Sequence, residues 1–218
     1  ELIKSTLKNL PKNLTELEIK GTYYGKYNKL PSNLKQLTIV QKNCKAQARS
    51  MNTLPKELMK LKLFTIPKHN IKIFPTKLVE LHIKSEYFNH KLRNLPTTLK
   101  VLIVDSVQYN RKINNLPNSV EVLSIRCCNF NHKFRSFPNK LKVFDINSDK
   151  FCKRLGNLPD SLEILNICCN NFRRKINKLP PKLVKLYINI DNKQFFDLKI
   201  FINEMDLVQK YLIKHCCK

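Results

Sequence analysis

Cysteine and histidine are the residue types in this 218-residue chain best suited to metal binding or nucleophilic catalysis. The chain has eight cysteines and five histidines, and none of them has the spacing of a zinc site or a metalloprotease helix. Phosphate-binding glycine loops, serine nucleophile motifs and paired-carboxylate motifs are also absent from the sequence. We therefore expect no catalytic residue, no metal, no cofactor and no small-molecule substrate, and we expect a binding protein instead of an enzyme.

Pairs of adjacent basic residues form a regular chemical pattern. Five pairs recur every 21 residues: His90 and Lys91, Arg111 and Lys112, His132 and Lys133, Lys153 and Arg154, and Arg174 and Lys175. Stacked about 5 Å apart, they would form a double row of cations about 20 Å long, suited to nucleic acid or another polyanion. The alternative is a row of cations that faces only solvent and counterions. The net charge of +25 favours an acidic partner, although a composition rich in Lys, Asn and Ile also raises it.

These pairs are positioned by a repeat of about 21 residues, marked by an apolar residue followed by proline. The marker prolines are spaced by 20, 24, 20 and then five times by 21 residues: Pro11, Pro31, Pro55, Pro75, Pro96, Pro117, Pro138, Pro159 and Pro180. Apolar residues recur three, six and eight positions after each proline, and the last two positions alternate as in a short half-buried strand. One unit cannot bury its own apolar side, so we expect nine stacked units with parallel strands in one sheet.

Two further columns are expected in the core. An aromatic residue recurs eight positions before the proline, as in Phe88, Tyr109 and Phe130. Small residues recur ten positions after the proline and include Cys127 and Cys169. Alternation turns this second column back inward after the strand, so we expect both thiols to be core residues.

The pattern proline-x-x-Leu-x-x-Leu-x-Ile resembles a leucine-rich repeat. Phe88-Asn89, Tyr109-Asn110 and Phe130-Asn131, each followed by an apolar residue and then Leu-Pro or Phe-Pro, resemble more closely the FNIP repeats of social amoebae and giant amoebal viruses. The resemblance covers about residues 3 to 190, with Cys152 and Arg173 in place of the asparagine. It implies a solenoid with one curved parallel sheet of about nine short strands and irregular return segments. Such repeats often follow an F-box, so substrate recognition for a ubiquitin ligase is a hypothesis that requires an F-box upstream of Glu1.

The concave face of this sheet should display the residues five, seven and nine positions after each proline. It is nearly neutral, with six basic and five acidic residues. One of its columns is β-branched over four consecutive repeats. Such a stripe is either a groove for a protein partner or a consequence of the strand preference of β-branched residues. The candidate protein-binding residues are Val101, Ile103, Val122, Val143, Ile164 and Tyr187.

The two ends of the chain differ from the array. We expect repeats over residues 1–190 and an amphipathic helix within residues 191–218, acting as a cap or as a docking helix for a partner. No apolar run approaches the roughly 18 residues of a membrane span. Vicinal cysteines argue against a secreted disulfide framework, so we expect an intracellular protein, in a cytoplasm or associated with a virion.

These observations favour a non-enzymatic protein-interaction scaffold or a component of a larger, viral assembly. Its partner would be a protein that is acidic or that carries an apolar segment. The alternative is a module that binds nucleic acid or another polyanion. The first function would use the apolar concave stripe, and the second would use the basic pairs.

Overall fold

The computed structural model describes residues 10–21, 30–41, 54–64, 71, 73–174, 176 and 178–189. Lys175 and the expected helix within residues 191–218 lie outside these residues. The described chain forms nine five-residue strands: β1 (Glu16–Lys20), β2 (Gln36–Val40), β3 (Lys60–Phe64), β4 (Glu80–Lys84), β5 (Val101–Asp105), β6 (Val122–Arg126), β7 (Val143–Asn147), β8 (Ile164–Cys168) and β9 (Lys185–Asn189).

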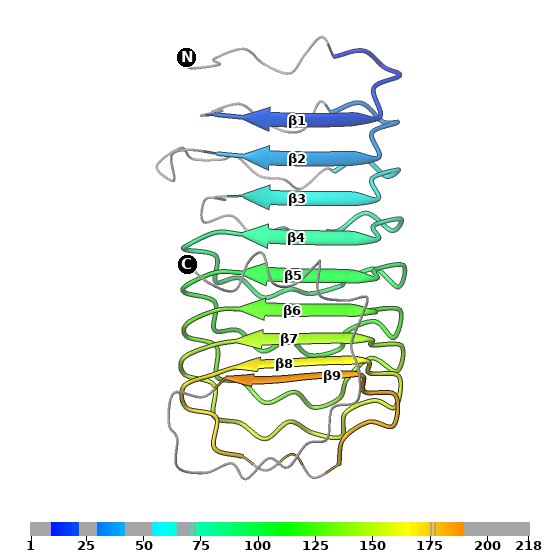
Figure 1. Ribbon diagram of the computed structural model, residues 1–218. Helices are drawn as coiled ribbons and strands as arrows, with labels where there is room; N and C mark the ends of the chain where they lie inside the picture. Colours follow the sequence, from blue (N-terminus) through cyan, green and yellow to red (C-terminus); the bar gives the residue numbers. More distant parts are fainter. Residues whose placement is uncertain are drawn as a thin grey trace.

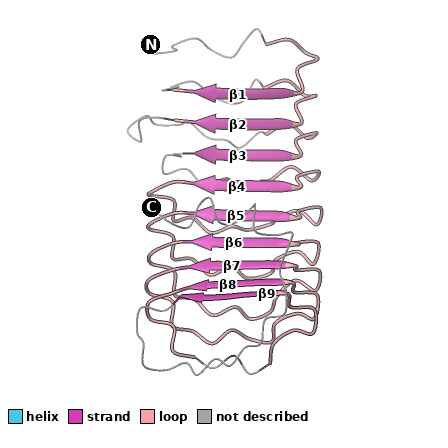
Figure 2. Cartoon of the chain, in the orientation of Figure 1, coloured by secondary structure: helices cyan, strands magenta, loops and turns pink. Residues whose placement is uncertain are grey.

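All nine strands belong to one sheet, in sequence order, and each is parallel to its neighbours (Figure 1). The remaining described residues are turns and loops that return behind the sheet to the start of the next strand (Figure 2). The register joins equivalent residues of successive repeats, as in Leu102 beside Leu123 and Val104 beside Ile125. The expected solenoid with nine parallel strands is therefore confirmed.

A tight turn precedes every strand. In all nine repeats the N–H of the residue three positions after the proline donates to the proline carbonyl, over 3.0–3.2 Å. Proline fits here because its φ is fixed and because this position, just outside the strand, requires no N–H donor. The turn delivers its leucine to the core, where Leu78, Leu99 and Leu141 are fully buried. The proline-x-x-Leu spacing is thus the sequence signature of a turn that starts a strand.

Five aromatic rings stack through the return side of the core. The centroids of neighbouring rings from Phe88 to Phe172 lie 5.7–6.2 Å apart, and their planes lie within 19° of parallel. Offset stacking of this kind contributes about 0.5–1.5 kcal/mol per pair beyond the burial of the rings. The expectation that this column belongs to the core is confirmed. The rings are Phe88, Tyr109, Phe130, Phe151 and Phe172.

Polar side chains join each repeat to the one before it. The Oγ of Ser106 donates to the carbonyl of Phe88 at 2.8 Å, and the Oγ of Ser148 donates to the carbonyl of Phe130 at 2.9 Å. Cys127 and Cys169 occupy the same position in their repeats and are buried, as expected. The two serines satisfy carbonyls of the irregular return segment, whereas the thiols of Cys127 and Cys169 donate to the carbonyls of the strand residues Val104 and Ile146, at 3.5 and 3.7 Å.

The asparagine that follows the aromatic residue has a structural role of its own. Asn89 Oδ1 accepts a hydrogen bond from the N–H of Asn110 at 3.0 Å, and Asn110 Oδ1 accepts one from the N–H of Asn131 at 3.2 Å. The same bond runs from Cys152 N–H to Asn131 Oδ1 at 3.2 Å. In each case the asparagine side chain accepts a hydrogen bond from the backbone of the following repeat, so the aromatic-Asn motif links neighbouring repeats.

Tyr109 supplies a stability test of the aromatic stack. It is fully buried, and its Oη has no hydrogen-bond partner among the described residues. Replacing Tyr109 with Phe keeps the stacked ring and removes an unsatisfied buried hydroxyl, so the free energy of unfolding should rise by about 1–2 kcal/mol. Chemical denaturation followed by circular dichroism measures the change.

Phe130→Leu is the matched control, since it removes a neighbouring ring and should lower the free energy of unfolding. A Tyr109→Phe protein that is less stable than the original by more than about 1 kcal/mol would show that the hydroxyl has a partner after all.

Candidate functional site

The apolar stripe on the concave face is continuous across four strands. Val101, Val122 and Val143 are direct register neighbours on β5, β6 and β7, and Ile164 follows on β8. The three valines are half-buried, whereas Ile164 is 5% exposed and offers a partner little surface. The structure thus brings four of the candidate protein-binding residues into one column.

The other two candidates lie in the central column of the same face. Ile103 is half-buried on β5, beside Val101. Tyr187 is 48% exposed on β9, two strands beyond the last valine of the stripe. Ile103 therefore widens the stripe, while Tyr187 stands apart from it. The binding role of all six residues stays a prediction.

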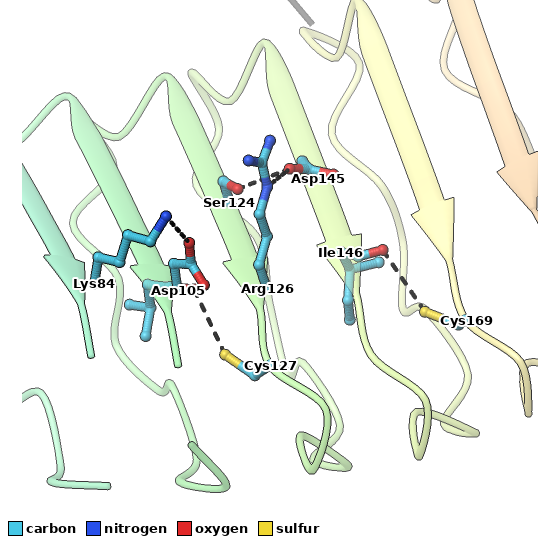
Figure 3. Close-up of polar contacts among 9 residues, drawn as sticks. Lys84, Asp105, Ser124, Arg126, Cys127, Asp145, Ile146 and Cys169 are labelled. Carbon is cyan, nitrogen blue, oxygen red and sulfur yellow. Dashed lines mark hydrogen bonds and ion pairs between the residues drawn. The ribbon is translucent and has the colours of Figure 1, made fainter. Parts of the chain in front are cut away.

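A polar cluster lies beside the stripe. Asp145 is 5% exposed, so the charge of its carboxylate requires compensation by nearby donors. Two donors from β6 supply it: Ser124 Oγ donates to Asp145 Oδ2 at 2.7 Å, and Arg126 Nε donates to the same oxygen at 3.0 Å (Figure 3). The cluster is therefore satisfied internally.

Most of the other charges on the concave face are also paired with one another. Lys84 Nζ lies 3.7 Å from Asp105 Oδ2 (Figure 3), and Lys62 Nζ lies 3.4 Å from Glu80 Oε1. Lys20 pairs with Glu18 on β1 at 2.9 Å. The nearly equal numbers of basic and acidic residues on this face therefore correspond to local ion pairs. Few charged side chains remain unpaired there to bind a charged partner.

The basic pairs lie on the return segments, and their two members differ in role. In three of the five pairs, the first residue contacts a backbone carbonyl of the preceding repeat. Arg111 Nε donates to the carbonyl of Asn89 at 2.9 Å, and Arg174 Nε donates to that of Cys152 at 3.1 Å. His132 Nε2 lies 3.1 Å from the carbonyl of Asn110, as in a donating tautomer. These three residues thus hold neighbouring repeats together.

The second residue of each described pair faces solvent. Lys91, Lys112, Lys133 and Arg154 are exposed, and no described residue forms an ion pair with them. Of the remaining members, His90 and Lys153 are half-buried, and Lys175 lies outside the described residues. The second residues therefore form a row of exposed cations with no ion-pair partner among the described residues, beside first residues of which three bind carbonyls.

Two adjacent grooves lie on these segments. The larger has a volume of about 780 Å³ and is lined by Lys91, Arg93, Arg111, Lys112 and His132 together with asparagine amides. The smaller, of about 470 Å³, shares Lys91, Arg93 and Arg111 and adds His90. Arg93 was not among the residues expected from the sequence, because it lies outside the basic pairs. No Asp or Glu lines either groove.

No group of three or more His, Cys, Asp or Glu side chains among the described residues lies close enough together to hold a metal ion. Nor does any helix in the described part of the chain have the length and apolarity needed to cross a membrane.

Comparison with known proteins agrees with the geometry. The model of the FNIP repeat matches residues 88–128, which span β5 and β6 and the return segments before them. The chain has the fold of a leucine-rich-repeat solenoid, and residues 88–128 match the FNIP repeat. In these repeats the aromatic residue is the stacked core ring, and the asparagine is the one that bonds to the next repeat.

Among solved structures, this solenoid is similar to CroV588 of a giant virus, described as a novel circular leucine-rich-repeat protein structure. The TM-score is 0.61 at 24% identity, over 85% of this chain and 32% of that chain. A weaker likeness, with a TM-score of 0.33 at 18% identity, joins 88% of this chain to 59% of YopM from Yersinia enterocolitica WA-314. The chain thus spans about a third of CroV588, and no curated protein matches it.

The vicinal cysteines allow a test of the register on β6. Cys127 is buried and Cys128 is exposed, because successive residues at the end of the strand point to opposite sides. Burial raises the pKa of the Cys127 thiol to about 12, so it stays protonated at pH 8. Alkylation with iodoacetamide at pH 8, mapped by mass spectrometry, should modify Cys128 and leave Cys127 unmodified until the protein is denatured.

The pair Cys168 and Cys169 is the internal control, since burial raises the pKa of Cys169 in the same way, also to about 12. Equal labelling rates for Cys127 and Cys128 in the native protein would contradict this register.

Proposed function

We propose that this protein is a non-enzymatic interaction scaffold that binds an extended apolar segment of a partner protein along the concave face of β5–β8. The observation that carries the proposal is the continuous stripe of Val101, Val122 and Val143 on a face whose charges are paired internally. Contiguous apolar surface of this kind marks interaction sites on proteins.

Strand preference alone does not account for the stripe. The equivalent position on the other strands is polar or charged, and those strands pair in the same register. β-Branched residues at this position are therefore not required for the sheet to form. Their restriction to four neighbouring strands supports a role in binding. The polar residues at the equivalent position are Glu16, Gln36, Lys60, Glu80 and Lys185.

An extended polypeptide fits both the apolar stripe and the neighbouring column that contains Asp145 and Asn166. The buried Oδ1 of Asn166 has no hydrogen-bond partner among the described residues, and it lies next to the polar cluster of Asp145. An extended backbone offers N–H donors to such an acceptor and apolar side chains to the stripe. A strongly charged segment is disfavoured, because Asp105 and Asp145 already have cationic partners.

The likeness of the fold to a giant-virus protein supports placing this scaffold in a viral assembly. The ubiquitin-ligase hypothesis stays a prediction, because it concerns sequence upstream of Glu1.

The test uses a peptide library displayed on phage and selected on the whole chain, with a variant that carries Val122→Asp and Val143→Asp. Selected peptides should be rich in apolar residues. They should bind the variant at least about ten-fold more weakly, because two carboxylates in the stripe would be desolvated by the peptide. Fluorescence anisotropy with the selected peptides measures the loss.

The matched control is Val107→Asp with Val184→Asp, which adds the same two charges at exposed valines outside the stripe. This control should bind the peptides as the original chain does. If the stripe variant melts at a lower temperature, Val122→Thr with Val143→Thr replaces it, since threonine keeps the β-branch. Peptides that bind the original chain and the folded stripe variant equally well would refute the proposal.

A further inference from the structure

Acidic residues are segregated from the return side of the solenoid. In all nine repeats, the eight residues before the marker proline include no Asp or Glu. A lysine-rich composition raises the number of cations everywhere, but it does not remove acids from one side of each repeat. In the five segments 88–96, 109–117, 130–138, 151–159 and 172–180, the twelve Lys and Arg residues are Lys91, Arg93, Arg111, Lys112, Lys133, Arg135, Lys153, Arg154, Arg173, Arg174, Lys175 and Lys178.

Ion pairs are likewise confined to the strands and the turns that lead into them, among the described residues. None of them involves a described residue of the five return segments. The concave face is thus compensated internally, while the positive charge of the return side has no protein counterion there. Such a surface attracts an anionic macromolecule.

Part of this positive charge lines the two grooves of the return side. Lys91, Arg93 and Arg111 line both of them, so the grooves adjoin one another across successive repeats. The guanidinium of Arg111 is fixed by its Nε bond to the carbonyl of Asn89, which leaves its Nη groups for a ligand. A guanidinium held in this way is oriented for two parallel bonds to one phosphate.

From this arrangement we infer that the return side binds the phosphate backbone of double-stranded nucleic acid without reading its sequence. The cation rows extend over five repeats, about 20 Å at the spacing of parallel strands, or roughly six base pairs of duplex. Single strands are usually held by base stacking on exposed aromatic rings. The aromatic rings of this side are instead buried in the core stack, so contacts to the backbone of a duplex are what the surface offers.

The inference concerns a different surface from the proposed function, and neither depends on the other. Its test measures binding of a short fluorescein-labelled DNA duplex to the whole chain by anisotropy over a series of salt concentrations. The logarithm of the association constant should fall linearly with the logarithm of the salt concentration, by about 0.9 per phosphate neutralised. Duplexes of unrelated sequence should bind equally.

The diagnostic variant carries Lys91→Gln, Arg93→Gln and Lys112→Gln, three exposed cations that line the larger groove. It should bind the duplex at least about ten-fold more weakly and with a salt slope shallower by roughly 2–3. The matched control carries Lys60→Gln, Lys62→Gln and Lys84→Gln, which removes the same charge from the concave face. Its affinity should stay within about two-fold of the original.

Three outcomes would overturn the inference. The first is a flat salt response, and the second is an equal loss of affinity in the groove variant and the concave control. The third is preferential binding of another anion, either an oligothymidine single strand or polyglutamate, over the duplex. Thermal melting of both variants shows that they are folded, and peptides selected on the concave face should still bind the groove variant.

Discussion

The backbone of one repeat in this solenoid is satisfied by the next repeat, and every other feature depends on that exchange. The carbonyl of Thr15 accepts hydrogen bonds from the N–H groups of Lys35 and Gln36, and the same arrangement recurs from strand to strand. Side chains repeat the pattern, since Asn89 and Ser106 each bond to a neighbouring repeat. Equivalent positions about 21 residues apart therefore become spatial neighbours, so that any residue preference within the unit becomes a continuous column in the structure.

This constraint explains how much of the fold could be predicted from the sequence. The proline turn and the alternating strand are local signals repeated nine times, and the aromatic column recurs in six repeats. This is why the strands and the buried Cys127 and Cys169 were expected correctly. Contacts between repeats are not local signals. The donors to Asp145 come from the previous strand, and the charge of Arg93 becomes part of a groove only when the return segments are stacked. Likewise, Ile164 matches the valines of the stripe in chemistry, and its low exposure becomes visible only in three dimensions.

The same exchange between repeats also explains why charge is distributed unequally. On the strands, a cation on one repeat and an anion on the next stand close enough to pair, as Lys84 and Asp105 do. Along the edge of the sheet, Glu121 pairs with both Lys100 and Lys142, and the hydrogen bond from Lys142 is the main cause that lowers the pKa of its carboxyl. The return segments have no anions for such pairing. Stacking therefore concentrates their like charges, and the carbonyl bonds of Arg111, His132 and Arg174 fix part of that row in place.

Both candidate surfaces belong to the same few repeats, on opposite sides of one core. The stripe lies on β5–β8, and the grooves lie on the return segments that lead into β5 and β6. Between them stand the buried strand residues and the ring stack from Phe88 to Phe172. A close-packed core of this kind keeps a substitution on one surface from rearranging the other. An apolar segment on the sheet and a phosphate backbone on the return side would therefore be bound independently, and the chain would join a protein to nucleic acid without coupling their affinities.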